Sequence, residues 1–176
     1  CLCDIVQKNI DDGFYDPEFI ELYTKDEINI LQSYIKHERD EDLTYAAMEQ
    51  FRGKYLVQNR ATGQIFETPQ VAYMMIAATL FSRYPEKKRM AYVKAYYDAI
   101  STFRISLPTP VMAGVRTPQR QFSSCVLIET DDSLDSINAT SGAIVKYVSK
   151  RAGIGIGAGH IRSIGSSITG GHATHT

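Results

Sequence analysis

Apolar residues in the first hundred positions recur mostly at the spacing of an α-helix. Ile28, Leu31 and Ile35 lie three and four positions apart, which predicts a helix with one buried face. Thr24 and Glu27 precede this pattern as a capping box, in which the two side chains satisfy exposed backbone N–H groups. The pattern therefore predicts a helix that starts just after Thr24.

Turn signals and charge divide this helical region. A short helix is expected over residues 2–11, and the charged run 36–42 is expected to be a solvated connection. Residues 54–57 and 64–67 flank a turn that contains Thr62-Gly63, and this arrangement predicts a β-hairpin.

Two longer helices are expected next. Thr68 is placed as an N-cap with Pro69 at the first helical position. The apolar stripe of this helix is expected to face the core and comprises Val71, Met74, Met75, Ala78 and Phe81. Pro85 ends it, and a second amphipathic helix is expected over residues 86–101. One side of that second helix presents Tyr92, Ala95, Tyr96 and Ala99.

The pattern changes near residue 104. Residues 105–110 hold two prolines and are expected to be extended, whereas residues 122–129 alternate like a strand. Asp132-Ser133 is expected to cap a helix that runs to Lys150, and glycines then occupy every second position of 153–159. Strand, helix, strand is the minimal parallel unit. The predicted fold class is therefore α followed by α/β, with a partial helical domain over 1–104 and an incomplete α/β domain over 105–176.

Composition narrows the class of protein. The chain has 176 residues, of which 44% are hydrophobic and 22% charged, and this balance is typical of a globular protein. The chain has 19 basic and 20 acidic residues, so it lacks the excess positive charge that is typical of a dedicated nucleic-acid-binding protein. No apolar run is long enough for a transmembrane helix, and three cysteines favour a reducing, cytoplasmic location. Because the chain begins with Cys1, we interpret it as a piece of a longer protein.

Cys125 is the thiol of greatest chemical interest. It lies in a predicted strand, where Ser123 shares its face and Ser124 lies on the other. A buried structural cysteine is the commoner outcome for a free thiol. A redox or nucleophilic role requires a base or a second thiol nearby, and the local sequence contains neither.

Two further features suggest ligand binding. The alternating glycines fit neither a dinucleotide fingerprint nor a P-loop, so they indicate close approach by either a packed neighbour or a ligand. Asp132-Ser133 together with Arg162 is a candidate anion or nucleotide site, and an ordinary helix cap with a surface Arg is the alternative. Cys1-x-Cys3 has no standard zinc spacing, so no metal site is expected.

Several segments together resemble the large (α) subunit of class I aerobic ribonucleoside-diphosphate reductase. The resemblance spans essentially the whole chain and is seen in residues 105–110, 114–118, 120–129 and 132–156, with further matches at 45–46, 54–57 and 81–85. It implies the C-terminal part of a helical N-terminal domain, followed by the first strand–helix–strand unit of a ten-stranded α/β barrel.

The resemblance also implies roles for individual residues. Cys125 matches the strand cysteine that reduces the ribose and becomes half of a redox-active disulfide, whose partner lies outside the chain. Thr109, Ser124, Cys125 and Gly153 match positions around the ribonucleotide substrate. The expected allosteric effector site, for a deoxynucleoside triphosphate or ATP, comprises Asp132, Ser133, Leu134 and Arg162.

The expected partners follow from the same resemblance. They are a small (β) subunit that supplies the radical from its metal centre, a thioredoxin or glutaredoxin, and a second copy bound through the helix over residues 133–150. No cofactor is expected on this chain itself, and neither membrane nor nucleic acid is expected as a partner. Thr169 stands where the family often has a second phosphate-binding Arg, and His160 and His172 also depart from the family pattern. The alternative function is a non-catalytic nucleotide-binding or assembly module of a split reductase.

Overall fold

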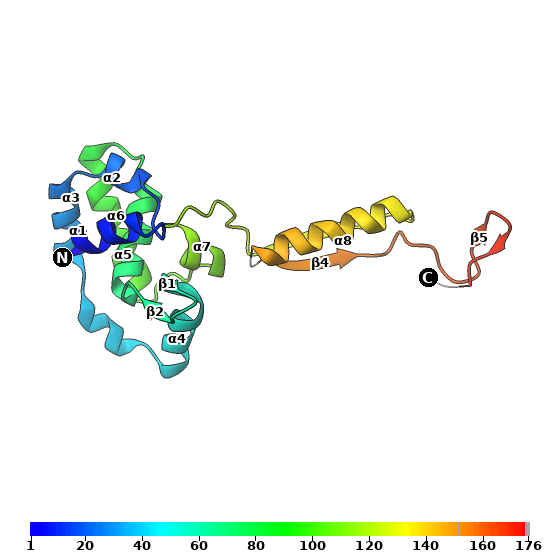
Figure 1. The fold of residues 1–176 in the computed structure, drawn as a ribbon, viewed down its shortest axis with the longest axis horizontal. Coiled ribbons are helices and arrows are strands. Elements are labelled where there is room, and N and C mark those ends of the chain that lie inside the picture. Colours follow the sequence, from blue (N-terminus) through cyan, green and yellow to red (C-terminus); the bar gives the residue numbers. More distant parts are fainter. Residues whose placement is uncertain (151, 175–176) are drawn as a thin grey trace. The chain divides into compact units, whose positions relative to one another are not determined.

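The computed structural model describes residues 1–150 and 152–174, which fall into two compact units. Unit 1 comprises Cys1–Phe122 and unit 2 comprises Ser123–Thr176 (Figure 1). The boundary lies later than the expected change near residue 104, because Val115 and Arg116 are buried within unit 1.

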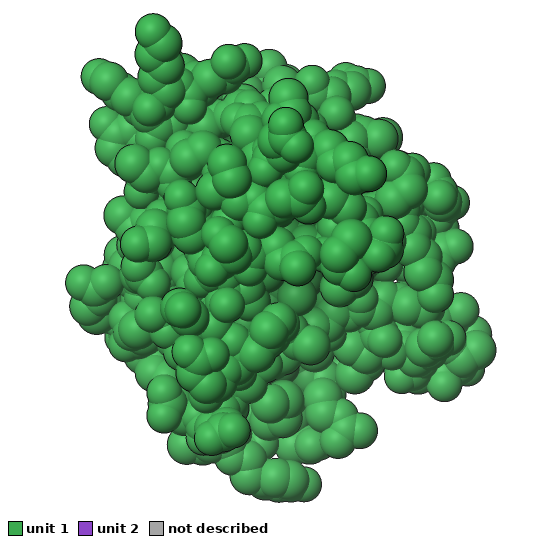
Figure 2. Space-filling view, turned by 90° about the vertical axis from the view of Figure 1, so that its left-hand side faces the viewer, with its two compact units in different colours: residues 1–122 green, residues 123–176 purple. Residues whose placement is uncertain are grey.

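Unit 1 is built almost entirely from helices. Its elements are α1 (Leu2–Asp11), α2 (Glu18–Leu22), α3 (Lys25–Tyr34), the 3-10 helix η1 (His37–Asp42), α4 (Tyr45–Gln50), the π-helix η2 (Phe51–Tyr55), β1 (Gln58–Asn59), β2 (Gln64–Ile65), α5 (Pro69–Phe81), α6 (Glu86–Ser101) and α7 (Thr109–Gly114). Figure 2 shows one face of this unit. Both predicted N-caps are confirmed: Thr24 and Glu27 form the capping box of α3, and the Thr68 hydroxyl accepts a hydrogen bond from the Val71 amide.

Helix α5 forms the centre of the unit 1 core. It is buried on all sides from Pro69 to Ala78, so the predicted stripe is only part of its buried surface. Helix α6 packs against it. The buried residues of α6 are Arg89, Val93, Tyr97, Ile100 and Ser101.

The buried side of α6 is therefore not the side that carries Tyr92 and Ala95. Tyr92 is exposed, and its ring stacks on Phe81 with the centroids 5.8 Å apart. Tyr96 packs edge-on against the same Phe81 ring. These aromatic residues gather where α5 ends rather than along the core, so aromatic content alone did not identify the buried side.

Three local expectations need correction. The run over residues 36–42 includes the 3-10 helix η1, and it is not simply solvated, because Arg39 donates to Asp98 at 2.8 Å. The predicted hairpin forms, but its first strand begins at Gln58 because residues 51–55 adopt a π-helix. Thr109 is not extended, since it begins α7 with Pro110 in the first helical turn, a position that proline tolerates.

Unit 2 contains the predicted strand–helix–strand arrangement. Strand β3 (Cys125–Glu129) pairs in parallel with β4 (Gly153–Gly157), and α8 (Leu134–Ser149) connects them. Figure 1 shows α8 running alongside β4. A small antiparallel hairpin follows, with strands β5 (Ser167–Ile168) and β6 (Gly171–His172). This hairpin was not predicted, although Gly170 at its turn has a φ of 87°, a conformation that favours glycine.

No helix in the part of the chain that the structure describes is both long and apolar enough to span a membrane.

Candidate nucleotide-binding sites

The first candidate site lies where β3 and β4 begin. Cys125 is directly opposite Gly153 in the parallel register, and the Gly153 amide donates to the Ser124 carbonyl at 2.8 Å. Three of the four expected substrate residues therefore lie together in unit 2. The fourth, Thr109, belongs to unit 1, where it is half-buried at the start of α7.

Cys125 is an exposed free thiol in this unit. A Cβ atom placed on Gly153 would stand 3.5 Å from the Cys125 sulfur, which is ordinary contact. The missing side chain at Gly153 leaves the thiol uncovered on that side, so a ligand can approach it.

The other two glycines of β4 have a different explanation. A Cβ atom on Gly155 would lie 3.2 Å from a methyl group of Leu127, and one on Gly157 would lie 2.5 Å from a carboxylate oxygen of Glu129. Side chains of β3 therefore lie across the bare positions of β4. At Gly155 and Gly157 the structure favours the packed neighbour over the ligand.

The second candidate site surrounds the start of α8. Arg162 Nε donates to Asp132 Oδ2 at 2.6 Å, so the two residues that were grouped from the sequence form an ion pair. Ser133 caps α8 by accepting a hydrogen bond from the Ser136 amide at 3.1 Å. These residues line a cavity of about 510 Å³, together with Leu134.

The other residues that line this cavity were not predicted from the sequence. They are Ile137, Ile161, Ile168, Ala173 and Thr174. Ile137 lies four residues after Ser133, so helical spacing was a usable signal for it. The hairpin residues gave no such signal, because the hairpin itself was not predicted. The expected departure at Thr169 lies in the turn of this hairpin and is not among the lining residues.

The cavity combines an ionic rim with an apolar wall. Arg162 and Asp132 are both partly exposed, so their pairing is open to competition from an anion. A guanidinium can bind phosphate oxygens through two parallel hydrogen bonds, and the isoleucine side chains provide a surface for a flat, less polar group. This arrangement suits a ligand that has an anionic end and a ring.

Helix α8 also has a largely exposed apolar side. Its exposed apolar residues are Leu134, Ile137, Val145, Tyr147 and Val148. Among the described residues of α8, only Thr140 is buried. Its hydroxyl forms a hydrogen bond of 2.7 Å with the Thr130 hydroxyl. The helix therefore contributes little to a core in unit 2 as it stands.

Within residues 1–150 and 152–174, no cluster of three or more His, Cys, Asp or Glu side chains is arranged to hold a metal ion. Cys1 and Cys3 lie at the start of α1 in unit 1, and the Cys3 thiol donates to the Asn29 side chain at 3.5 Å.

The fold defines a class of protein: an all-helical domain followed by the start of a domain with parallel strands. Two family profiles match these parts in the same order, namely "Ribonucleotide reductase, all-alpha domain" over residues 41–120 and "Ribonucleotide reductase, barrel domain" over residues 123–176. The boundary between the profiles agrees with the structural boundary after Phe122.

Curated relatives agree along nearly the whole chain. Ribonucleoside-diphosphate reductase 1 subunit alpha of Escherichia coli (strain K12) is 61% identical over 99% of this chain, and the subunit alpha of Haemophilus influenzae is 60% identical over 99%. The subunit alpha of Enterobacteria phage T4 is 53% identical over 98%. The chain belongs to the family of ribonucleotide reductase large subunits. It spans 23% of the length of each of these three relatives.

Proposed function

We propose that the full-length protein containing this chain is the large subunit of a ribonucleoside-diphosphate reductase. It would reduce ribonucleoside diphosphates to 2′-deoxyribonucleoside diphosphates, and the chain alone would be inactive. The observation that best supports this proposal is the parallel register that sets Cys125 directly opposite Gly153, a residue with no side chain to cover the thiol, where the two strands begin. A reducing thiol needs this kind of access to the ribose of a bound nucleotide.

The proposed role of Cys125 is to donate reducing equivalents. Removing the 2′-hydroxyl requires two electrons and two protons, and two thiols supply both when they form one disulfide while the hydroxyl leaves as water. Cys125 is one of these thiols, and its partner lies outside the chain. A thioredoxin or glutaredoxin then reduces the disulfide, and the metal-containing small subunit supplies the radical that starts the reaction. Thr109, Ser124 and Gly153 bind the substrate.

The Cys125 proposal is tested by Cys125→Ser in the full-length subunit assembled with its small subunit. Multiple turnover supported by thioredoxin should be lost, because serine cannot form the disulfide. Cys3→Ser is the matched control, since Cys3 is also a free thiol but lies in unit 1. Unchanged turnover in Cys125→Ser would contradict the assignment.

We also propose that the cavity at the start of α8 binds the allosteric nucleotide, a deoxynucleoside triphosphate or ATP. Arg162 binds its phosphates, Asp132 its ribose hydroxyl, and Ser133 and Leu134 form the adjoining wall. Arg162→Ala should weaken effector binding and abolish the effector's influence on which substrate is reduced. Arg83→Ala is a suitable control, because Arg83 is an exposed Arg of unit 1 that also pairs with a carboxylate, Glu18. Equal effector binding by the wild type and Arg162→Ala would contradict this site.

The exposed side of α8 supports a further proposal, a homodimer formed through residues 133–150. Val145→Glu should shift the full-length subunit from dimer to monomer in analytical ultracentrifugation, because it places a charge within an apolar interface. Lys94→Glu on the exposed side of α6 is the control and should leave the dimer intact. The proposed setting for this assembly is the cytoplasm.

The non-catalytic module remains a second candidate because the cavity and α8 both lie within unit 2. A monodisperse chain of residues 1–176 that binds a deoxynucleoside triphosphate by itself would favour that module. Aggregation that is relieved by the remainder of the subunit would favour the enzyme.

A further inference from the structure

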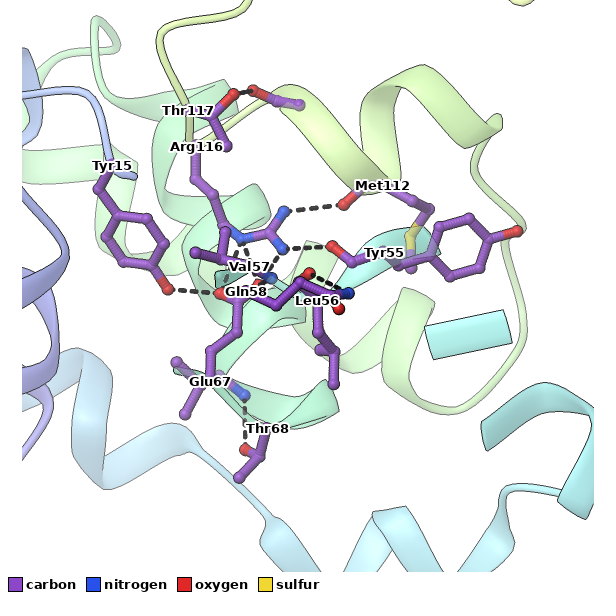
Figure 3. Close-up of polar contacts among 12 residues, drawn as sticks. Tyr15, Tyr55, Leu56, Val57, Gln58, Glu67, Thr68, Met112, Arg116 and Thr117 are labelled. Carbon is purple, nitrogen blue, oxygen red and sulfur yellow. Dashed lines mark hydrogen bonds and ion pairs between the residues drawn. The ribbon is translucent and has the colours of Figure 1, made fainter. Parts of the chain in front are cut away.

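A fully buried ion pair joins Glu67 and Arg116 inside unit 1. Neither side chain has any exposed surface, and Arg116 contacts both carboxylate oxygens of Glu67 (Figure 3). Tyr15 donates its hydroxyl to Glu67 Oε2 at 2.5 Å, and the Val57 amide donates to Glu67 Oε1 at 2.7 Å. Every carboxylate oxygen therefore has several donors.

Each nitrogen of the Arg116 guanidinium likewise has a hydrogen-bond acceptor. Besides Glu67, Arg116 Nη1 donates to the Met112 carbonyl at 2.8 Å and Nη2 donates to the Tyr55 carbonyl at 2.8 Å. Burial raises the pKa of Tyr15 well above its ordinary value, and the negative charge of Glu67 raises it further. The tyrosine therefore stays protonated and remains a donor to the pair.

The pair connects segments that are distant in the sequence. Glu67 lies between β2 and α5, Tyr15 follows α1, Tyr55 ends η2, and Arg116 follows α7. Burying two opposite charges is costly unless the geometry is good, and replacement by apolar residues is often neutral for stability. A network of this kind is more easily explained if it fixes the position of a particular element.

Helix α7 is the element that needs fixing. It has only six residues, which is too short for stability on its own. Arg116 holds the carbonyl of Met112, and the amide of Met112 donates at 3.1 Å to the carbonyl of Pro108, the residue directly before Thr109. The buried pair is thus connected to the start of α7 through one helical turn.

We propose that Glu67 and Arg116 are positioning residues that hold Thr109 in place for the substrate. This inference rests on the proposed function, because it assumes that Thr109 binds the ribonucleotide. Displacement of α7 would move the Thr109 side chain while leaving Cys125, which lies in unit 2, chemically unchanged. The pair therefore acts on substrate binding more than on the chemical step.

The test is a double-mutant cycle in the full-length enzyme with Glu67→Gln and Thr109→Val. Glu67→Gln should raise KM for the ribonucleoside diphosphate by about tenfold while kcat changes by less than about threefold. Thr109→Val should raise KM similarly, and the double variant should have nearly the same KM as Thr109→Val alone. This non-additivity is the expected result of a shared path, whereas a purely structural pair would give additive effects or no effect on KM.

A second Arg–Glu pair of unit 1, in which Arg89 is buried and Glu27 half-buried, provides the control. Arg89 and Glu27 join α3 to α6 in unit 1, and the Arg89 guanidinium contacts both oxygens of Glu27 at 2.6 Å. Glu27→Gln should lower the thermal midpoint but leave KM at the wild-type value. If Glu67→Gln does not fold, Tyr15→Phe removes one donor from Glu67 and should raise KM by about two- to fivefold.

The outcomes separate the two levels of the proposal. A wild-type KM in folded Glu67→Gln, or in Tyr15→Phe where Glu67→Gln does not fold, overturns the positioning role if Thr109→Val raises KM. A wild-type KM in Thr109→Val instead contradicts the substrate role of Thr109 and with it the proposed function at that residue. Additive increases in the double variant also overturn the positioning role.

Discussion

The two units differ most in how they bury their apolar residues. Unit 1 surrounds α5 from Pro69 to Ala78, and its core includes residues from α1 to the segment after α7. In the described part of unit 2, the buried apolar residues are Ala152 and Ala173, while Leu127, Leu134 and Val145 are each more than two-thirds exposed. Unit 1 therefore has a core of its own, whereas the apolar side chains of unit 2 stay largely uncovered in this chain, which spans 23% of the length of its relatives.

The contrast extends to the two arginine–carboxylate pairs. Arg116 and Glu67 are both 0% exposed, whereas Arg162 and Asp132 are 41% and 34% exposed. Breaking a buried pair leaves a charge without a partner, but an exposed pair exchanges readily with water or with a ligand. The first pair is suited to holding structure in place, and the second is suited to recognising an anion.

The largest expected effect comes from removing the arginine of each pair. Arg116→Ala should destabilise unit 1 by about 3–5 kcal/mol, whereas Arg162→Ala should cost unit 2 about 1 kcal/mol or less. Tyrosine fluorescence during urea unfolding reports on unit 1, because every tyrosine except Tyr147 lies there. Amide exchange in β3 and β4 reports on unit 2. If the two substitutions lowered the stability of their units by similar amounts, the proposed difference between the buried pair and the exposed pair would be contradicted.

Two leucines in helices of the two units give a matched comparison of burial. Leu31 in α3 is 0% exposed and Leu134 in α8 is 85% exposed. Leu31→Ala should cost about 2–5 kcal/mol because it leaves a cavity in the core. Leu134→Ala should change stability by no more than about 0.5 kcal/mol. Its measurable effect should be weaker nucleotide binding in the cavity, and a large loss of stability would contradict the exposed position.

Acid should destabilise unit 1 through its paired carboxylates. Burial opposes ionisation of Glu27, but hydrogen bonds from Arg89 and Thr24 outweigh it and lower its pKa below the ordinary 4.5. Burial likewise opposes ionisation of Asp16, and hydrogen bonds from the Glu18 amide and from Arg120 lower its pKa below 3.8. In both cases the folded state binds the proton less tightly than the unfolded chain does.

The stability from these groups is therefore fully present above the ordinary pKa values and is lost as the pH falls through the lowered ones. Glu27→Gln should reduce the loss of unfolding free energy below pH 4.5 relative to the wild type. Burial raises the pKa of Asp40, which acts in the opposite direction, but this contribution is common to both proteins and cancels in the comparison. Parallel pH profiles for the wild type and Glu27→Gln would contradict the assignment.

The smallest expected effect concerns one helical glycine in each unit. Gly142 in α8 has no atom within 4 Å of an added Cβ, so Gly142→Ala should stabilise the helix by about 0.5–1 kcal/mol in thermal unfolding followed by circular dichroism. Gly114 ends α7, where an added Cβ would lie 3.3 Å from Gln119. Gly114→Ala should therefore give no such gain. Equal stabilisation by the two substitutions would contradict the described packing.

Local signals predicted more of the structure than long-range ones. Thr24 and Thr68 marked the starts of α3 and α5 because a helix cap depends on residues only a few positions apart. The strand–helix–strand order in unit 2 was also predicted, and β3 and β4 pair in parallel as expected. The hairpin β5–β6 was missed because each strand has only two residues and no apolar alternation.

Side-chain partners were predictable only in part. The grouping of Asp132 with Arg162 came from the sequence, and the structure pairs them. Glu67 and Arg116 were not singled out, because a buried pair between distant segments has no local pattern in the sequence.

The most direct measurement of the central claim follows the redox state of Cys125 through one turnover. The full-length large subunit, assembled with its small subunit and pre-reduced, is given a ribonucleoside diphosphate without external reductant, and its thiols are then alkylated and mapped by mass spectrometry. The account predicts that Cys125 enters a disulfide in proportion to the deoxyribonucleotide formed, while Cys1 and Cys3 remain alkylated as free thiols. Formation of the product with Cys125 still fully alkylated would contradict it.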